Sequence, residues 1–274
     1  MTELVVHIGL PKTATTFLQR KVLRKNPSVR MFHKKNSPEL IKKAQSFLRK
    51  GSGDISDLGR YLDGDRVNVL TNENISLTDM SFWSNRGACT PAILANNLRR
   101  LSNLLFGRPD AVRAILSIRR QDRWVASRYA QSASKFAEPG QQDFERRVQK
   151  AITRHFSTRG VWIDYAHVIE TLEKACPNGV LVLMQEELEH DPVAWARKLD
   201  AFLGTKESLE VVEKETSKGT EKYSLSVNED TWKLKLESSV YITLHDKIKN
   251  SILREYAGSN KKLMSRDLVF DHYY

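Results

Sequence analysis

Four short apolar runs rich in β-branched residues are spread along the first two thirds of the chain. They cover residues 4–8, 66–71, 112–118 and 180–184. Runs of this length that end in turn residues predict buried strands. Helical patterns lie between them over residues 38–50, 91–106 and 162–175. Strands alternating with helices predict an α/β fold, a P-loop-like three-layer sandwich in which helices cover both faces of a central parallel sheet of about four or five strands.

The end of the chain has a different pattern. Apolar residues recur at every fourth position, at Leu236, Val240, Leu244, Ile248 and Ile252. This spacing predicts one amphipathic helix. With 274 residues and 40% hydrophobic content, the chain can bury one sizeable core. We therefore expect a single domain over residues 1–274 with a helical C-terminal extension from about residue 229.

The first strand leads into a candidate anion site. Gly9 and Pro11 break the strand, Lys12 follows, and four small residues open a helical run: Thr13, Ala14, Thr15 and Thr16. The first amides of a helix are unpaired and its dipole adds positive charge there, so this position favours an anion. The Walker phosphate loop needs a longer loop with a glycine before the lysine, so this segment is a different kind of site or an ordinary Thr-rich helix start.

A second candidate site follows the third strand. Arg119 leaves the end of that strand, and Ser127 lies eight residues later on a helix that begins near Gln121. We expect both side chains to reach one phosphate, because an arginine supplies a charged fork and a serine supplies a hydroxyl donor. The alternative is a basic amphipathic helix on the surface.

Two further segments carry candidate chemistry. Glu73 comes directly after the second strand, and carboxyl ends of parallel strands are where open α/β sheets bind ligands. Glu73 is thus a candidate general base, although a glutamate in a polar turn is the commoner case. Residues 217–223 place Gly219 between two lysines, which suits either a loop that contacts an anion or a plain flexible basic loop.

These segments together resemble the sulfotransferase family. Residues 11–18 fit the 5′-phosphosulfate loop, approximately Pro-Lys-(Thr/Ser)-(Gly/Ala)-Thr-Thr-x-(Leu/Trp). Arg119, Ser127 and Tyr129 fit the family's 3′-phosphate segment, with Gln121 where proline is usual. The segment at 217–223 is similar to the lysine–glycine loop that closes over the nucleotide in glycosaminoglycan-type members.

The resemblance implies a donor, an acceptor and a set of site residues. The donor would be 3′-phosphoadenosine 5′-phosphosulfate (PAPS), its product adenosine 3′,5′-bisphosphate (PAP), and the acceptor a hydroxyl of a carbohydrate or glycoconjugate. Lys12 and Glu73 would be catalytic. The residues implied in binding the nucleotide are Pro11, Lys12, Thr13, Ala14, Thr15, Thr16, Arg119, Ser127, Lys218, Gly219, Thr220 and Lys222. Phenol- and steroid-type relatives use a histidine as the base, which would make His33 or His155 the alternative to Glu73.

Composition narrows the picture further. The formal net charge is +11, and residues 1–50 hold twelve Lys or Arg against two Glu. Such charge attracts many anions without selecting nucleic acid. We expect a cytoplasmic protein, because two cysteines make no disulfide framework and no apolar run approaches the roughly 20 residues of a membrane span. No metal cluster is visible. The aromatic segment 79–90 could line an acceptor pocket or plug a core.

Two other function classes remain open from the sequence. One is a small-molecule kinase that uses ATP and magnesium; the missing second glycine argues against it. The other is a non-enzymatic protein that binds nucleic acid or an anionic membrane. Only net charge supports that class, because few aromatic residues are interleaved with the basic runs.

Overall fold

The computed structural model describes residues 3–77, 80, 82–83, 89–153, 160–216, 225–228 and 230–266. The chain divides into two compact units. The first comprises Met1–Leu77, Cys89–Ile118 and Ile169–Gly219, and the second comprises Thr78–Ala88, Arg119–Val168 and Thr220–Tyr274.

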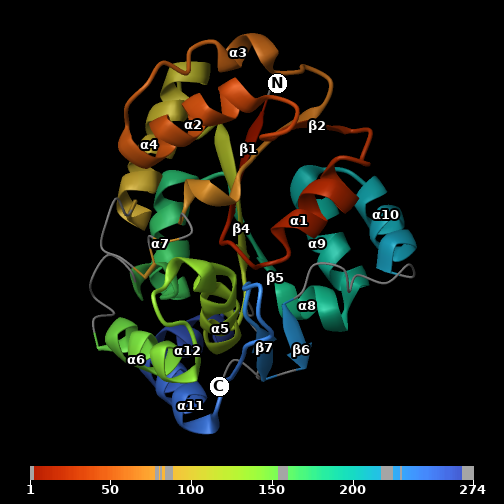
Figure 1. The fold of residues 1–274 in the computed structure, drawn as a ribbon. Coiled ribbons are helices and arrows are strands. Elements are labelled where there is room, and N and C mark those ends of the chain that lie inside the picture. The colour runs from red at the N-terminus through yellow and green to blue at the C-terminus, as the bar shows by residue number, and fades with distance from the viewer. Residues whose placement is uncertain are drawn as a thin grey trace. The chain divides into compact units, whose positions relative to one another are not determined.

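A five-stranded sheet forms the centre of the first unit (Figure 1). Its strands are β1 (Leu4–Gly9), β2 (Val29–Phe32), β3 (Val67–Thr71), β4 (Val112–Ile118) and β5 (Val180–Met184). They lie in the order β2-β3-β1-β4-β5, and every neighbouring pair is parallel. Every residue of β1 is buried, as expected for a central parallel strand covered on both faces. The predicted α/β fold with a central parallel sheet is confirmed.

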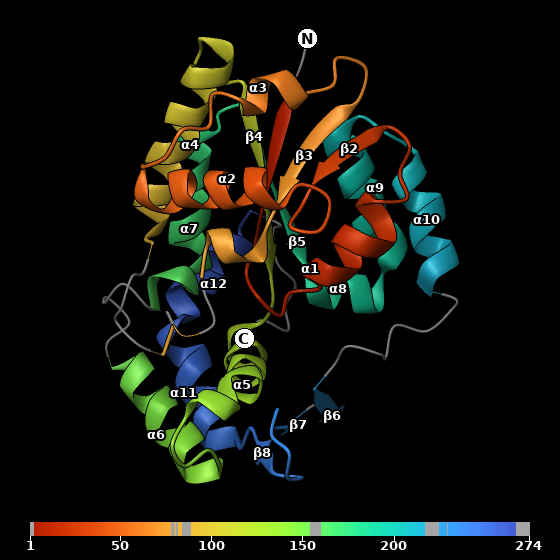
Figure 2. The same ribbon diagram turned by 45° about the horizontal axis from the view of Figure 1, so that its top comes forward.

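Helices cover both faces of this sheet, as Figure 2 shows. The helices are α1 (Thr15–Phe17), η1 (Leu18–Leu23, a π-helix), α9 (Pro192–Leu203) and α10 (Glu207–Thr216) on one face, and α2 (Pro38–Lys50) and α4 (Pro91–Phe106) on the other. On the first face, Val5, Val69 and Ile115 of the sheet pack in one buried cluster with η1, α9 and α10. Short helices α3 (Leu58–Tyr61) and α8 (Gln185–His190) complete the unit.

The second unit contains helices and a small antiparallel sheet. Its helices include α5 (Gln121–Ser132), α6 (Gln141–Ile152), α11 (Asp246–Glu255) and α12 (Ala257–Met264), and its strands are β6 (Ser226–Asn228), β7 (Thr231–Lys233) and β8 (Tyr241–Thr243). The residues of α7 (Tyr165–Ala175) are assigned to the second unit up to Val168 and to the first unit from Ile169. Phe82 and Trp83 are buried in the second unit, where Phe82 packs edge-on against Trp124 with ring centroids 4.9 Å apart. They therefore plug a core, which was one of the two alternatives for this segment.

The single helix predicted from Leu236 to Ile252 is wrong in its first half. Residues Tyr241–Thr243 form β8, and the helix begins only at Asp246. The physical reason lies in the pattern itself. A spacing of four is a multiple of the two-residue period of a strand, and Ile242 and Leu244 alternate as buried residues along β8 and its end. The sequence spacing was compatible with either element.

Candidate functional site

The loop that follows β1 has an unusual backbone. Lys12 has φ of 71° and Ala14 has φ of 56°, so two non-glycine residues within three positions are left-handed. Such a conformation costs an L-residue roughly 1–2 kcal/mol, and it persists only where the surroundings impose it. Ala14 is followed at once by the right-handed helix α1. A left-handed residue beside a right-handed one turns consecutive N–H groups toward one point, which is the geometry of an anion-binding nest.

The threonine hydroxyls hold this loop together from inside. Thr13 Oγ1 donates to the carbonyl oxygen of Leu10 at 2.6 Å, and Thr15 Oγ1 donates to the same oxygen at 3.3 Å. Both side chains are buried. A hydroxyl has one hydrogen to donate, so these two hydroxyls fix the loop and do not supply extra donors to an anion. Of the three threonines in the loop, Thr13 and Thr15 are thus engaged inside it, and Thr16 stays partly exposed.

The loop is packed closely on the end of β1. A Cβ at Gly9 would lie 2.7 Å from Thr15 Oγ1 and 3.1 Å from Cε1 of His7. No larger residue fits there without moving the loop. The backbone N–H of Leu10 also donates to the carbonyl oxygen of Ser117 at 3.3 Å, which joins the loop to the end of β4.

Glu73 lies in a short turn, η2 (Glu73–Ile75), directly after β3. Ser76 Oγ donates to the carbonyl oxygen of Gly9 at 3.2 Å, so this turn is held against the end of β1. Asn72 caps the turn by accepting the backbone N–H of Asn74 at 3.0 Å. Glu73 itself is partly exposed. The structure thus brings the Glu73 turn and the Lys12 loop to the same end of the sheet.

A buried arginine supports the Glu73 turn from the side. Arg49, near the end of α2, donates to the carbonyl oxygens of Asn74 at 2.9 Å and of Ser76 at 3.0 Å. Burial lowers the pKa of Arg49. Because carbonyl oxygens near a short helical turn otherwise lack partners, this arginine stabilises the turn.

His7 joins the three central strands of the sheet. Its Nδ1 lies 2.7 Å from Thr71 Oγ1 of β3, and its Nε2 lies 2.9 Å from Ser117 Oγ of β4. Burial lowers the pKa of His7 to about 3, so the ring is a weak base, and with both nitrogens engaged and no exposed surface it cannot take a proton from an acceptor. His33, another candidate base, is mostly buried at the end of the edge strand β2, with Nδ1 2.8 Å from Asn36 Oδ1.

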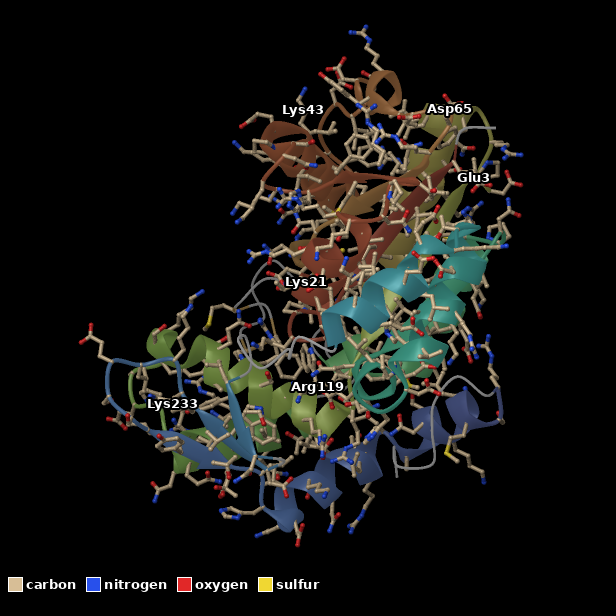
Figure 3. The ribbon with its side chains drawn as sticks, turned by 90° about the vertical axis from the view of Figure 1, so that its right-hand side faces the viewer. Glu3, Lys21, Lys43, Asp65, Arg119 and Lys233 are labelled. Carbon is tan, nitrogen blue, oxygen red and sulfur yellow. The ribbon has the colours of Figure 1, made fainter. Side chains whose placement is uncertain are left out.

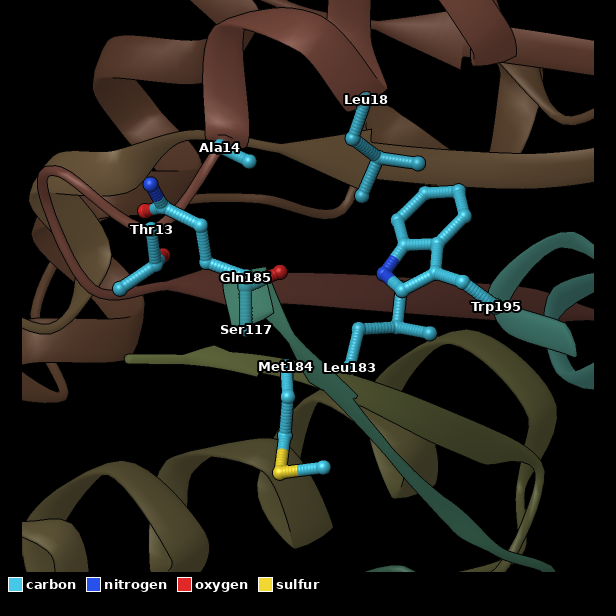
Figure 4. Close-up of a pocket in the computed structure, with 8 residues that line it drawn as sticks. All are labelled: Thr13, Ala14, Leu18, Ser117, Leu183, Met184, Gln185 and Trp195. Atoms are coloured by element: carbon cyan, nitrogen blue, oxygen red, sulfur yellow. The ribbon is translucent and has the colours of Figure 1, made fainter. Parts of the chain in front are cut away.

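A shallow depression lies beside the loop (Figure 4). Its lining residues are Thr13, Ala14, Leu18, Ser117, Leu183, Met184, Gln185 and Trp195. Their side chains leave no room for a water molecule between them, so this depression is not a ligand cavity.

The second candidate segment lies in the other unit. Arg119, labelled in Figure 3, follows β4 directly and is mostly buried, and Tyr165 donates its hydroxyl to the Arg119 carbonyl oxygen at 2.5 Å. Ser127 is buried on α5. The neighbouring Arg120 is engaged by Asp122, with its Nε 2.7 Å from the carboxylate.

Two residues of this segment have structural partners. Gln121, which stands where the family has proline, is buried and donates to Asn260 Oδ1 of α12 at 2.7 Å. Tyr129 is buried, donates to Asp143 at 2.9 Å and accepts the backbone N–H of Gly140. Burial raises the pKa of Tyr129. These contacts connect α5 to α12 and α6 and account for both residues without a ligand.

Several expected site residues lie outside the described part of the chain. Those residues are Lys218, Gly219, Thr220, Lys222 and His155. Among the described residues there is no group of three or more His, Cys, Asp or Glu side chains arranged to hold a metal ion. Nor does any helix in the described ranges have the length and apolar character to cross a membrane.

The sulfotransferase domain family matches residues 105–269, which is more than half of the chain. This protein therefore belongs to the sulfotransferase family. The matched region contains Arg119 and Ser127 and begins after Lys12 and Glu73. No curated protein matches the sequence.

The fold is also that of a known sulfotransferase. The crystal structure of a sulfotransferase from Alicyclobacillus acidocaldarius aligns over 100% of this chain and 98% of its own, with a TM-score of 0.54 and 14% sequence identity. At this identity the likeness concerns the fold, with its central parallel sheet flanked by helices.

Sequence reasoning missed several residues that shape the site. They are His7, Gln19, Arg49, Ser117 and Gln185. His7 lies inside an otherwise apolar strand, and a polar residue in a fully buried strand must find hydrogen-bond partners. That signal was available for His7, whereas Arg49 and Gln185 carry no comparable pattern.

Proposed function

We propose that this sulfotransferase moves a sulfuryl group from PAPS to a hydroxyl of a carbohydrate or glycoconjugate. The observation that carries the proposal is the strained loop with Lys12 at the carboxyl end of the central strand. Two left-handed residues and two internal threonine bonds hold its amides in a nest, which suits a phosphate-type anion. Family membership supports sulfuryl transfer, and the resemblance of residues 11–18 to the phosphosulfate loop supports PAPS as donor.

The proposed chemistry is an in-line displacement similar to phosphoryl transfer. The acceptor oxygen forms a bond to sulfur, and the bond between sulfur and the bridging phosphate oxygen breaks, releasing PAP. Glu73 takes the acceptor's proton. Lys12 and the loop amides stabilise the negative charge that develops on the bridging oxygen. Arg119 and Ser127 bind the 3′-phosphate and thereby select PAPS over a nucleotide that lacks it.

Three features support the assignment of Glu73 over a histidine. The turn that carries Glu73 is fixed to the end of β1 by Ser76. His7 is fully buried and both of its ring nitrogens have hydrogen-bond partners, so it cannot reach an acceptor. His33 lies on the edge strand, with β3 between it and β1. His155 lies outside the described residues and is the base to test if Glu73 fails.

The proposal extends to the whole chain. The structural match over 100% of the sequence supports a single sulfotransferase domain over residues 1–274. It also includes a cytoplasmic location, which the free thiols of Cys89 and Cys176 support, because cytosolic proteins keep their cysteines reduced.

The experiment that tests the proposal is PAP release from PAPS in the presence of a panel of sugars and glycoconjugates. Lys12→Ala is expected to lower turnover by about a hundredfold or more, since the charge it removes acts in the transition state. The matched control is Lys42→Ala, which removes one charge from the exposed face of α2. Near-normal transfer by Lys12→Ala, with Lys42→Ala equally active, would contradict the role of this loop.

A further inference from the structure

A continuous chain of side-chain hydrogen bonds crosses the sheet beneath the Lys12 loop. Gln19 Nε2 of η1 donates to Thr71 Oγ1 of β3 at 2.9 Å. Thr71 Oγ1 contacts His7 Nδ1 at 2.7 Å, and His7 Nε2 contacts Ser117 Oγ at 2.9 Å. His7, Thr71 and Ser117 are all nearly or fully buried. The chain therefore connects the helix after the loop with three neighbouring strands.

The partners of Thr71 are side chains on two other elements. An amide nitrogen only donates, so Thr71 accepts from Gln19 and still has its own hydrogen. Within the described residues the Thr71 hydroxyl contacts only Gln19 and His7. In the neutral ring one nitrogen donates and the other accepts, so His7 can bond to Thr71 and Ser117 at the same time in either tautomer.

The strands that His7 joins are the ones whose ends carry the candidate chemistry. Thr71 is two residues before Glu73, and Ser117 is two residues before Arg119. His7 itself is five residues before Lys12, and its ring edge lies under the loop, 3.1 Å from where a Cβ of Gly9 would be. Because the two ring nitrogens of His7 bond in fixed directions, this side chain holds the carboxyl ends of β1 and β3 in a defined position relative to each other.

We infer that His7 is a positioning residue, whose bonds to Thr71 and Ser117 hold the Lys12 loop and the Glu73 turn in register for transfer. The inference rests on the proposed function, because it concerns the placement of the same two residues. His7 touches neither donor nor acceptor in this account. Its effect is on the geometry of the groups that do, and an error of about 1 Å in such geometry can cost a hundredfold in rate.

The test compares variants that break the two His7 bonds separately. Asn places an amide near the position of Nδ1 and can keep the bond to Thr71, whereas Gln reaches the position of Nε2 and can keep the bond to Ser117. Thr71→Val keeps the shape of the side chain and removes its hydroxyl. Each variant is assayed for PAP release from PAPS with an acceptor that the panel identifies, and for PAP affinity by calorimetry, well below its Tm.

We expect His7→Ala and Thr71→Val to lower kcat by about tenfold or more while PAP affinity changes less than threefold. We expect His7→Asn to recover part of the kcat that His7→Ala loses, because it restores the link toward β3. The control is Ser102→Ala, which removes a buried hydroxyl that bonds to Arg108 and Ala111 in the turn before β4. It should lower Tm without changing kcat.

The outcomes separate the inference from the proposed function. If the wild-type protein releases no PAP with any acceptor and does not bind PAP, the proposed function fails and the inference fails with it. If the wild-type protein is active and the His7 and Thr71 variants lose only Tm, as Ser102→Ala does, the proposed function stands and the positioning role of His7 is wrong.

Discussion

Lys12 and Ala14 are the two residues of this site whose backbone conformation is strained. Both have a left-handed backbone that glycine would adopt more easily. The hydroxyls of Thr13 and Thr15 impose that backbone by bonding to the Leu10 carbonyl oxygen. For the proposed function this means that the loop would be shaped before a ligand arrives, and that binding an anion there would cost little reorganisation.

The substitution Glu73→Gln tests whether Glu73 is the general base. We expect turnover to fall by about 10²–10⁴-fold, while PAP affinity and Tm stay near those of the wild type, because glutamine keeps the size of the side chain. Turnover of the wild type should fall at low pH as the carboxylate is protonated, and this acidic limb should vanish in the variant.

Glu39→Gln, an exposed change on α2, is the matched control and should keep full activity. If Glu73→Gln retains most of its turnover, the base lies elsewhere. The assignment to the carbohydrate type then weakens with it, and His155 is the next residue to substitute.

The π-helix η1 and helix α10 are linked by polar side-chain contacts. Glu215 near the end of α10 is almost fully buried, and its carboxylate binds Lys21 at 2.9 Å and also Lys25, both on the η1 side (Figure 3 labels Lys21). At the other end, Asn26 Nδ2 donates to Ser208 Oγ at 3.2 Å. The segment that follows the Lys12 loop is thus fixed to α10, which leads directly into the basic stretch 217–223.

Glu215→Gln should destabilise the protein by about 1–2 kcal/mol. This loss of unfolding free energy lies between the contribution of a hydrogen bond to a charged group and the contribution of an exposed ion pair. The reason is that the carboxylate is buried while both lysines are partly exposed. Thermal unfolding should show a Tm lower by a few degrees. Glu210→Gln, an exposed change on the same helix, should leave Tm unchanged. Equal Tm values for the two variants would mean that the Glu215 contacts contribute nothing.

The elements also show what sequence patterns can and cannot predict. Four strands were found because each is rich in aliphatic residues over five to seven positions, whereas β2 has only four residues and gave no comparable signal. The candidate anion site could be proposed from the sequence because the residue types of the Lys12 loop are contiguous. The inward direction of the Thr13 and Thr15 hydroxyls could not, since it depends on a left-handed backbone, and the His7 bonds depend on residues 64 and 110 positions away.

In the whole molecule, the candidate chemistry is divided between two units. Lys12 and Glu73 belong to the first, with the parallel sheet, while Arg119 and Ser127 belong to the second. The family match covers the second pair and not the first. The first pair is tested by Lys12→Ala and Glu73→Gln, and the second by Arg119→Ala.

The most direct test is calorimetry of the wild-type protein with PAP and with adenosine 5′-monophosphate, which lacks the 3′-phosphate. A charge-assisted contact is worth about 1.5–3 kcal/mol, so PAP should bind about ten- to a hundredfold more tightly, and Arg119→Ala should remove most of that difference. ATP should gain no affinity from magnesium. Equal affinities for PAP and the monophosphate, or tight binding of ATP only with magnesium, would contradict the account and favour a kinase.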